Sequence, residues 1–139
     1  MGETATGTVE RTLDPGGIVD TDILVDVLRE VTAAITFLRD AERYVTVTAI
    51  TQMELIQGSR NRAELRRVEQ FLRRFAVRGL SELIGGIGVS LMRQYRLSHG
   101  LLLPDALIAA CALEHGVTLY TKNVRHFRII PGLTVVRPY

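Results

Sequence analysis

Short runs of β-branched and apolar residues alternate along the chain with longer stretches whose apolar positions recur at helical spacing. The short runs predict five strands, one of them weak, and most are separated by a helix-length segment. This alternation predicts an α/β fold, a three-layer α/β/α sandwich around a central, mainly parallel sheet of four or five strands. The predicted strands are Gly17–Asp20, Tyr44–Thr48, the weak run Phe75–Leu80, Val117–Thr121 and Leu133–Arg137. The predicted helices are Thr21–Arg29, Ala33–Arg43, Thr48–Gly58, Arg62–Phe75, a segment that ends near Arg96, and Pro104–His115.

One stretch conflicts with this pattern. Gly85-Gly86-Ile87-Gly88 falls inside a segment that otherwise reads as a helix, where each glycine costs about 1 kcal/mol. Its spacing matches neither the dinucleotide-binding nor the P-loop motif. A loop or a close contact between helices is therefore expected here, rather than a phosphate site.

The length of 139 residues is typical of one domain. Residues 1–16 are polar and run into a turn at Pro15-Gly16-Gly17, so they predict a flexible N-terminal extension to a single domain at 17–139.

No apolar run approaches the roughly 20 residues that cross a bilayer, and the first residues lack the apolar core of a secretion signal. A cytoplasmic protein without membrane contact is expected. The single cysteine, Cys111, excludes an internal disulfide and is predicted to lie in the core.

The basic residues comprise sixteen arginines and one lysine, Lys122, in a chain of net charge +2. Seven of these arginines and two glutamates lie between Gly58 and Arg78, which gives that segment a net charge of +5. Such a stripe fits a nucleic-acid backbone, and a solvated helix face explains it equally well. The seven arginines occupy positions 60, 62, 66, 67, 73, 74 and 78.

Three carboxylates, Asp20, Glu54 and Asp105, stand among apolar neighbours. A buried carboxylate must be paired, hydrogen-bonded, protonated or bound to a cation. Asp20 ends the first predicted strand, Glu54 lies in the helix after the second, and Asp105 opens the helix before the fourth. Because strand C-termini and the N-termini of the packed helices share one edge of a parallel sheet, these acids are expected to converge.

Thr121, Lys122 and Asn123 follow the fourth predicted strand and reach the same edge. Three acids and an amide are oxygen donors with no histidine or thiolate expected beside them, a set that suits Mg²⁺ or Mn²⁺ better than zinc.

Each acid can also be explained by a purely structural role at the start of a helix. Thr51-Gln52-Met53-Glu54 matches a capping box, Asp105 complements a helix dipole, and Asp20 or Asp22 can cap the next helix. Taken together, the apolar flanks and the shared edge favour a site. Asp26 is interpreted as solvated and His126 as a loop residue without a catalytic role.

Four segments in this order resemble PIN-domain ribonucleases, specifically VapC-type toxins. The likeness runs from about Gly17 to Pro138. The segments are Ile18-Val19-Asp20-Thr21-Asp22, Thr48-Ala49-Ile50-Thr51-Gln52-Met53-Glu54, Pro104-Asp105-Ala106-Leu107-Ile108, and Tyr120-Thr121-Lys122-Asn123-Val124-Arg125-His126-Phe127.

This resemblance implies a Mg²⁺- or Mn²⁺-dependent endoribonuclease of a type II toxin–antitoxin system. It also implies inhibition by a cognate VapB-type antitoxin, and assembly as a homodimer or a larger toxin–antitoxin complex. The metal and catalytic acids carry over to Asp20, Glu54 and Asp105. Asn123 is implied as a further catalytic residue. It stands where many relatives have another aspartate, and its amide can coordinate but adds no charge. Thr21, Asp22 and Thr121 are implied as accessory residues.

In the mechanism that the resemblance implies, Asp20 and Asp105 hold the ion while Glu54 orients or deprotonates the attacking water. Arginines at the rim would hold the RNA backbone. Two alternatives remain at this point: an inactive PIN-like module that binds RNA or protein, for which Asn123 is the reason, and a signalling receiver domain, for which Lys122 is the reason.

Overall fold

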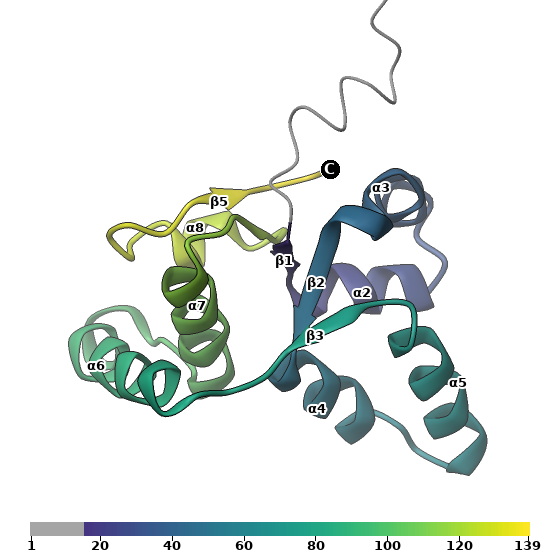
Figure 1. The fold of residues 1–139 in the computed structure, drawn as a ribbon, viewed down its shortest axis with the longest axis horizontal. Coiled ribbons are helices and arrows are strands. Elements are labelled where there is room, and N and C mark those ends of the chain that lie inside the picture. Colours follow the sequence, from purple (N-terminus) through teal and green to yellow (C-terminus); the bar gives the residue numbers. More distant parts are fainter. Residues whose placement is uncertain (1–15) are drawn as a thin grey trace, which may run out of the picture.

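A computed structural model describes residues 16–139, so the predicted extension at 1–16 lies outside the described residues apart from Gly16. The five strands form one sheet in the order β3-β2-β1-β4-β5 (Figure 1). Every pairing between neighbouring strands is parallel. The strands are β1 (Gly17–Val19), β2 (Val45–Thr48), β3 (Ala76–Arg78), β4 (Leu119–Tyr120) and β5 (Val135–Val136).

Helices connect the strands and lie on both faces of the sheet, as crossovers between parallel strands require (Figure 1). The helices are α2 (Thr21–Leu28), α3 (Thr32–Ala41), the 3₁₀ turn η1 (Glu42–Tyr44), α4 (Ala49–Gln57), α5 (Arg62–Leu72), α6 (Glu82–His99), α7 (Leu103–His115) and α8 (Val124–Phe127). The predicted α/β/α sandwich with a parallel sheet is thereby confirmed.

The sheet separates two hydrophobic cores. Ile18 and Val19 are adjacent in β1 and fully buried, yet Val19 belongs to the core with α2, α3 and α5, and Ile18 to the core with α6, α7 and α8. Successive side chains of a strand point to opposite faces, so one short strand supplies both layers. Helix α4 contributes Leu55 to the first core and Ile50 to the second.

The glycine-rich stretch is helical, and the loop alternative for it is wrong. Helix α6 runs without interruption through Gly85 to Gly88 and ends at His99. A Cβ atom built on Gly88 would lie 2.9 Å from Cδ2 of Leu107 in α7, so Gly88 is the place where the two helices approach most closely among these glycines. The expected close contact between helices is confirmed at this one position, and packing against α7 offsets the poor helix propensity of glycine.

The sequence also predicts that Cys111 is buried and that no helix crosses a membrane. Cys111 is fully buried in the second core, as predicted. Of the helices formed by residues 16–139, none combines the length and the hydropathy needed to cross a bilayer.

Candidate functional site

The carboxyl ends of β1 and β4, the two central neighbours of the sheet, carry Asp20 and Thr121. Asp20 is the N-cap of α2, and its Oδ1 accepts a hydrogen bond from the backbone N–H of Thr21 at 2.8 Å. Its Oδ2 accepts from Thr121 Oγ1 at 2.8 Å. Only 5% of Asp20 is exposed. The capping role considered from the sequence is real, and it holds the carboxylate at the sheet edge.

Asp22 lies in the first turn of α2, next to this pair. Its Oδ2 accepts from the backbone N–H of Lys122 at 3.1 Å and from Thr121 Oγ1 at 3.3 Å. Its Oδ1 is buried and has no hydrogen-bond partner within the described part of the chain. A buried carboxylate oxygen without a donor is costly and calls for a ligand such as a cation or an ordered water.

Glu54 reaches the same edge from the middle of α4. Its Oε1 accepts from Thr21 Oγ1 at 2.7 Å, and Thr21 Oγ1 in turn lies 2.8 Å from Thr51 Oγ1. The N-cap of α4 is Thr48, whose Oγ1 accepts from the backbone N–H of Thr51. The capping-box alternative is therefore wrong, because the helix begins three residues earlier and the Glu54 side chain turns to Thr21.

Asp105 lies in the first turn of α7, and its Oδ2 is 3.2 Å from Nε2 of His126 in α8. Both side chains are about three-quarters buried. Sequence reasoning missed this contact and placed His126 in a loop. The signal that could have revealed it is the position of His126 three residues after Asn123, in the segment already expected at this edge.

Asn123 is exposed and follows β4. Its backbone N–H donates to Thr121 Oγ1 at 3.0 Å, which fixes the loop against the Thr121 hydroxyl. The structure thus places Asn123 beside the acids through its backbone. Its suggested role as an amide ligand stays a prediction.

Burial and mutual repulsion raise the pKa values of three of these acids. Desolvation, followed by the charge of Asp22, raises the pKa of Asp20 to about 7. Desolvation likewise raises the pKa values of Asp22 and Asp105, and Glu54 and Asp22 add repulsion at Asp105 while His126 opposes the shift. Carboxylates gathered with too few donors are a site at which a cation binds favourably.

The donors suit a hard divalent ion whose coordination is completed by water. Across residues 16–139, no three histidine, cysteine or acidic side chains are gathered tightly enough to hold an ion unaided. Mg²⁺ commonly takes only one or two carboxylates and retains several waters, so this looser arrangement is compatible with it. The unpartnered Asp22 oxygen offers such an ion a ligand, and a bound cation would relieve the burial and repulsion that raise the pKa of Asp20.

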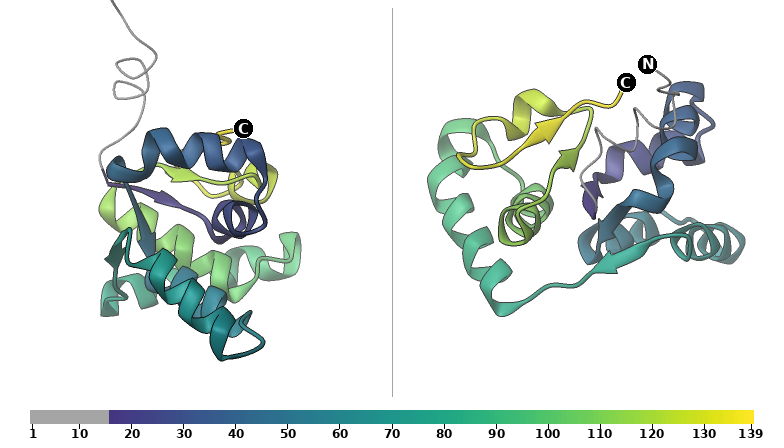
Figure 2. Two further views of the ribbon diagram at one scale, coloured as in Figure 1. Left: turned by 90° about the vertical axis from the view of Figure 1, so that its right-hand side faces the viewer. Right: turned by 45° about the horizontal axis from the view of Figure 1, so that its top comes forward.

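Asp26 is not the solvated residue expected from the sequence. Its Oδ2 lies 2.6 Å from Lys122 Nζ and accepts from the Tyr139 hydroxyl at 2.8 Å, and its side chain is 13% exposed. The hydrogen bond from Lys122 lowers the Asp26 pKa. The ring of Tyr139 also contacts Phe37, so the C-terminal end of the chain reaches α3 (Figure 2).

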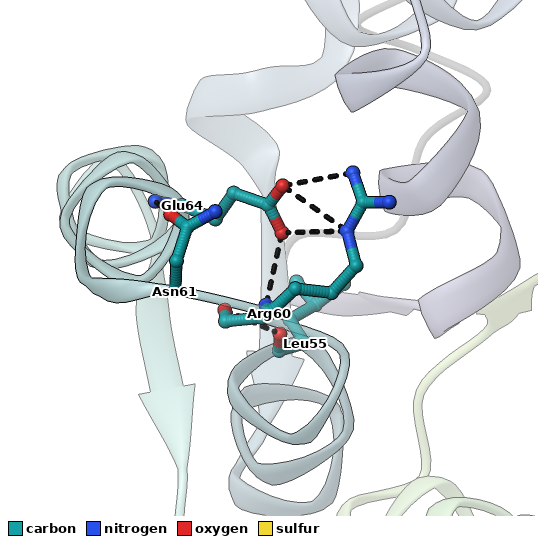
Figure 3. Close-up of polar contacts among 5 residues, drawn as sticks. Leu55, Arg60, Asn61 and Glu64 are labelled. Atoms are coloured by element: carbon teal, nitrogen blue, oxygen red, sulfur yellow. Dashed lines mark hydrogen bonds and ion pairs between the residues drawn. The ribbon is translucent and has the colours of Figure 1, made fainter.

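Several arginines of the stripe between Gly58 and Arg78 are paired with other groups of the protein. Arg60 forms an ion pair with Glu64 at 2.9 Å, and Figure 3 shows its guanidinium turned back on that carboxylate where α4 meets α5. Arg74 pairs with Glu42. Arg78 turns inward and donates to the Gly16 carbonyl and to Thr46 Oγ1. The stripe is therefore not a uniform cationic track.

A family model described as PIN domain matches residues 17–132, and the chain belongs to this family. It is 39% identical over 119 residues to ribonuclease VapC10 of Mycobacterium tuberculosis, covering 84% of this chain and 89% of that protein. It is 37% identical over 120 residues to ribonuclease VapC19 of the same organism, covering 84% and 95%. Within the family, these similarities place the chain with the VapC-type members.

The fold agrees with these relatives. One chain of a solved toxin–antitoxin complex from Klebsiella pneumoniae superimposes with a TM-score of 0.74 at 31% identity, over 89% of this chain and 98% of that chain. The resemblance recognised in the sequence is confirmed, and the receiver-domain alternative is excluded.

Proposed function

We propose that this protein is a metal-dependent endoribonuclease, the toxin of a type II toxin–antitoxin system, and that it hydrolyses RNA phosphodiester bonds. The observation that carries the proposal is the convergence of Asp20, Asp22, Glu54 and Asp105 at one sheet edge, with one Asp22 oxygen unpartnered. Two relatives that are 37% and 39% identical are named ribonucleases, which supports the same reaction.

Asp20 and Asp105 would hold a Mg²⁺ or Mn²⁺ ion, with Asp22 and Glu54 beside them. When bound, such an ion polarises the phosphate and stabilises the negative charge that develops on the leaving oxygen. Thr121 links the two aspartates, because its hydroxyl donates to Asp20 Oδ2 at 2.8 Å and lies 3.3 Å from Asp22 Oδ2. Asn123 is a further catalytic residue of this site in the proposal, which its position after β4 supports.

Glu54 is suited to orient and deprotonate the attacking water. Its Oε1 accepts a hydrogen bond from the Thr21 hydroxyl, which holds the carboxyl group in one orientation. A base that is prepositioned toward the reacting centre contributes about 10²–10⁴-fold to rate.

The proposed partners follow from the relatives. The structural neighbour from Klebsiella pneumoniae was solved as a toxin–antitoxin complex. We propose that a cognate VapB-type antitoxin holds this protein inactive in the cytoplasm, and that the toxin forms a homodimer within a larger assembly with it.

The test is cleavage of total cellular RNA by the purified, antitoxin-free protein with Mg²⁺ or Mn²⁺, and again with EDTA. Asp105→Asn should reduce cleavage by about a hundredfold or more, since it removes the negative charge of a proposed metal ligand. Asp40→Asn is the matched control, because Asp40 is an exposed acid of α3, and it should cut like the wild type. Undiminished cleavage by a folded Asp105→Asn protein would refute the assignment. RNA binding without any metal-dependent cleavage would favour an inactive binding module.

A further inference from the structure

A pocket of about 260 Å³ adjoins the acid cluster on the side of α6 and α8. We propose that this α6–α8 pocket binds the nucleotide that neighbours the cleaved phosphate of a single-stranded RNA, through its phosphate and its base. The inference rests on the proposed ribonuclease function and names the place where the substrate strand continues. The pocket is lined by His99, Asn123, Arg125, His126 and Ile129.

The pocket and the acid cluster share a wall. His126 lines the pocket, and its Nε2 lies 3.2 Å from Asp105 Oδ2. Asn123 also lines the pocket, and its backbone donates to the Thr121 hydroxyl that donates to Asp20. A strand that places one phosphate over the acids therefore brings the next nucleotide to this opening.

The charge of the pocket suits a phosphate. Its lining includes the Arg125 guanidinium and two imidazoles but no carboxylate. Arg125 is exposed and forms no ion pair with any residue between 16 and 139, whereas Arg60 is bound to Glu64. The planar donor fork of arginine matches phosphate oxygens, and here that fork is available for a ligand.

The other wall suits a base. The His99 ring is held by a 2.7 Å contact between Nδ1 and Ser98 Oγ, and the Tyr95 ring packs edge-on against it at 5.9 Å. Ile129 adds an apolar surface. Unpaired RNA bases stack on flat side chains, and a ring that is already fixed loses little freedom on binding.

The larger hollow beside Glu54, of about 490 Å³, is less suited to a phosphate chain. Its lining includes two carboxylates, Glu54 and Glu64. Arg60 is paired with Glu64, and Arg67 donates to the Leu28 carbonyl. Its residues are Val25, Leu28, Arg29, Glu54, Leu55, Gly58, Ser59, Arg60, Glu64, Arg67 and Val68. The α6–α8 pocket, by contrast, combines an arginine with a lining that has no acidic residue.

The test measures the affinity for a short fluorescein-labelled single-stranded RNA by anisotropy, in EDTA so that nothing is cut, over about 50 to 200 mM salt. Arg125→Ala should weaken binding several-fold and reduce the slope of log affinity against log salt by about 0.7, the value for one phosphate contact on a single strand. Arg39→Ala is the matched control, because Arg39 is an exposed arginine of α3, outside the pocket, and should leave both quantities unchanged.

His99 supplies a second, independent readout. His99→Ala should weaken binding with little change in salt slope, since stacking releases no counterions, and His99→Phe should restore affinity. An Arg125→Ala protein that folds normally and keeps the wild-type affinity and slope would overturn the proposal. The same anisotropy measurement is made with a labelled aspartate-rich peptide. If Arg125→Ala weakens binding of that peptide and leaves RNA binding unchanged, the pocket binds a protein segment and the proposal is overturned.

The two proposals fail separately. If the wild type cuts no RNA in Mg²⁺ but Arg125→Ala weakens RNA binding and lowers its salt slope, the nuclease proposal fails and the pocket is a nucleotide-binding site without cleavage. If the wild type cuts RNA and Arg125→Ala binds it unchanged, only the pocket proposal fails.

Discussion

Hydroxyl groups decide the geometry of the acid cluster at the scale of single residues. A carboxylate only accepts hydrogen bonds and each threonine has one hydroxyl proton, so the proton of Thr21 goes to Glu54 and Thr51 must donate to Thr21. Thr48 Oγ1 lies 3.4 Å from Thr51 Oγ1 and donates to it, which completes the series of hydroxyl hydrogen bonds. The direction of all three hydroxyls therefore follows from the hydrogen bond that Thr21 donates to Glu54.

Thr51 is consequently a positioning residue for Glu54. Thr51→Val keeps the side-chain shape but removes the donor to Thr21, so we expect slower RNA cleavage at unchanged KM and a stability loss of about 1 kcal/mol. Thr51→Ser keeps the hydroxyl and should recover most of the activity. Cleavage kinetics of the two variants check this, and a Thr51→Val enzyme with wild-type kcat would refute the role.

The pKa of Asp20 makes the stability of the metal-free protein depend on pH. The folded-state pKa is about 7 and the ordinary value is 3.8, so between these values the folded protein keeps a proton that the unfolded chain has released. Stability in EDTA should therefore fall as pH rises from about 4 to about 7, by a few kcal/mol at most. Raised pKa values at Asp22 and Asp105 act in the same direction.

Thermal unfolding in EDTA across this range checks the prediction. Asp20→Asn removes the titrating group, and its melting temperature should change less with pH than that of the wild type. Equal pH dependence of the two proteins would show that Asp20 titrates at an ordinary pKa.

At the scale of elements, the sequence predicted the strands and helices well because their apolar periodicity is local information. It also placed Asp20, Glu54 and Asp105 at one edge, since the ends of parallel strands must meet there. It could not predict which side chains meet across long separations. Tyr139 and Asp26 are 113 residues apart, and nothing in either neighbourhood marks their hydrogen bond.

Helix α6 shows the same limit, because local glycine propensity pointed to a loop and contact with α7 keeps the helix intact. Gly88→Leu should destabilise the protein by about 1–3 kcal/mol, since any Cβ atom there meets Leu107. Gly86→Leu is the matched substitution two residues earlier, where a Cβ atom meets nothing within 4 Å, and it should be neutral or stabilising. Chemical denaturation compares the two variants, and an equal effect would contradict the close helix contact.

At the scale of the whole molecule, two cores pack against a five-stranded sheet, and four carboxylates that influence one another electrostatically lie at one edge of it. Packing within the cores provides the stability that offsets repulsion among these acids. The C-terminal residues contribute from outside, because Tyr139 and Asp26 fix Lys122, whose backbone holds Asp22. The site therefore depends on contacts from both ends of the described chain.

The central claim is that these carboxylates form a divalent-cation site, and calorimetric titration of Mn²⁺ into the metal-free protein tests it most directly. We expect saturable binding by the wild type and by the exposed-acid control Asp40→Asn, and none by Asp20→Asn or Asp105→Asn. Binding that survives in both of these variants, or no binding by the wild type, would contradict the account.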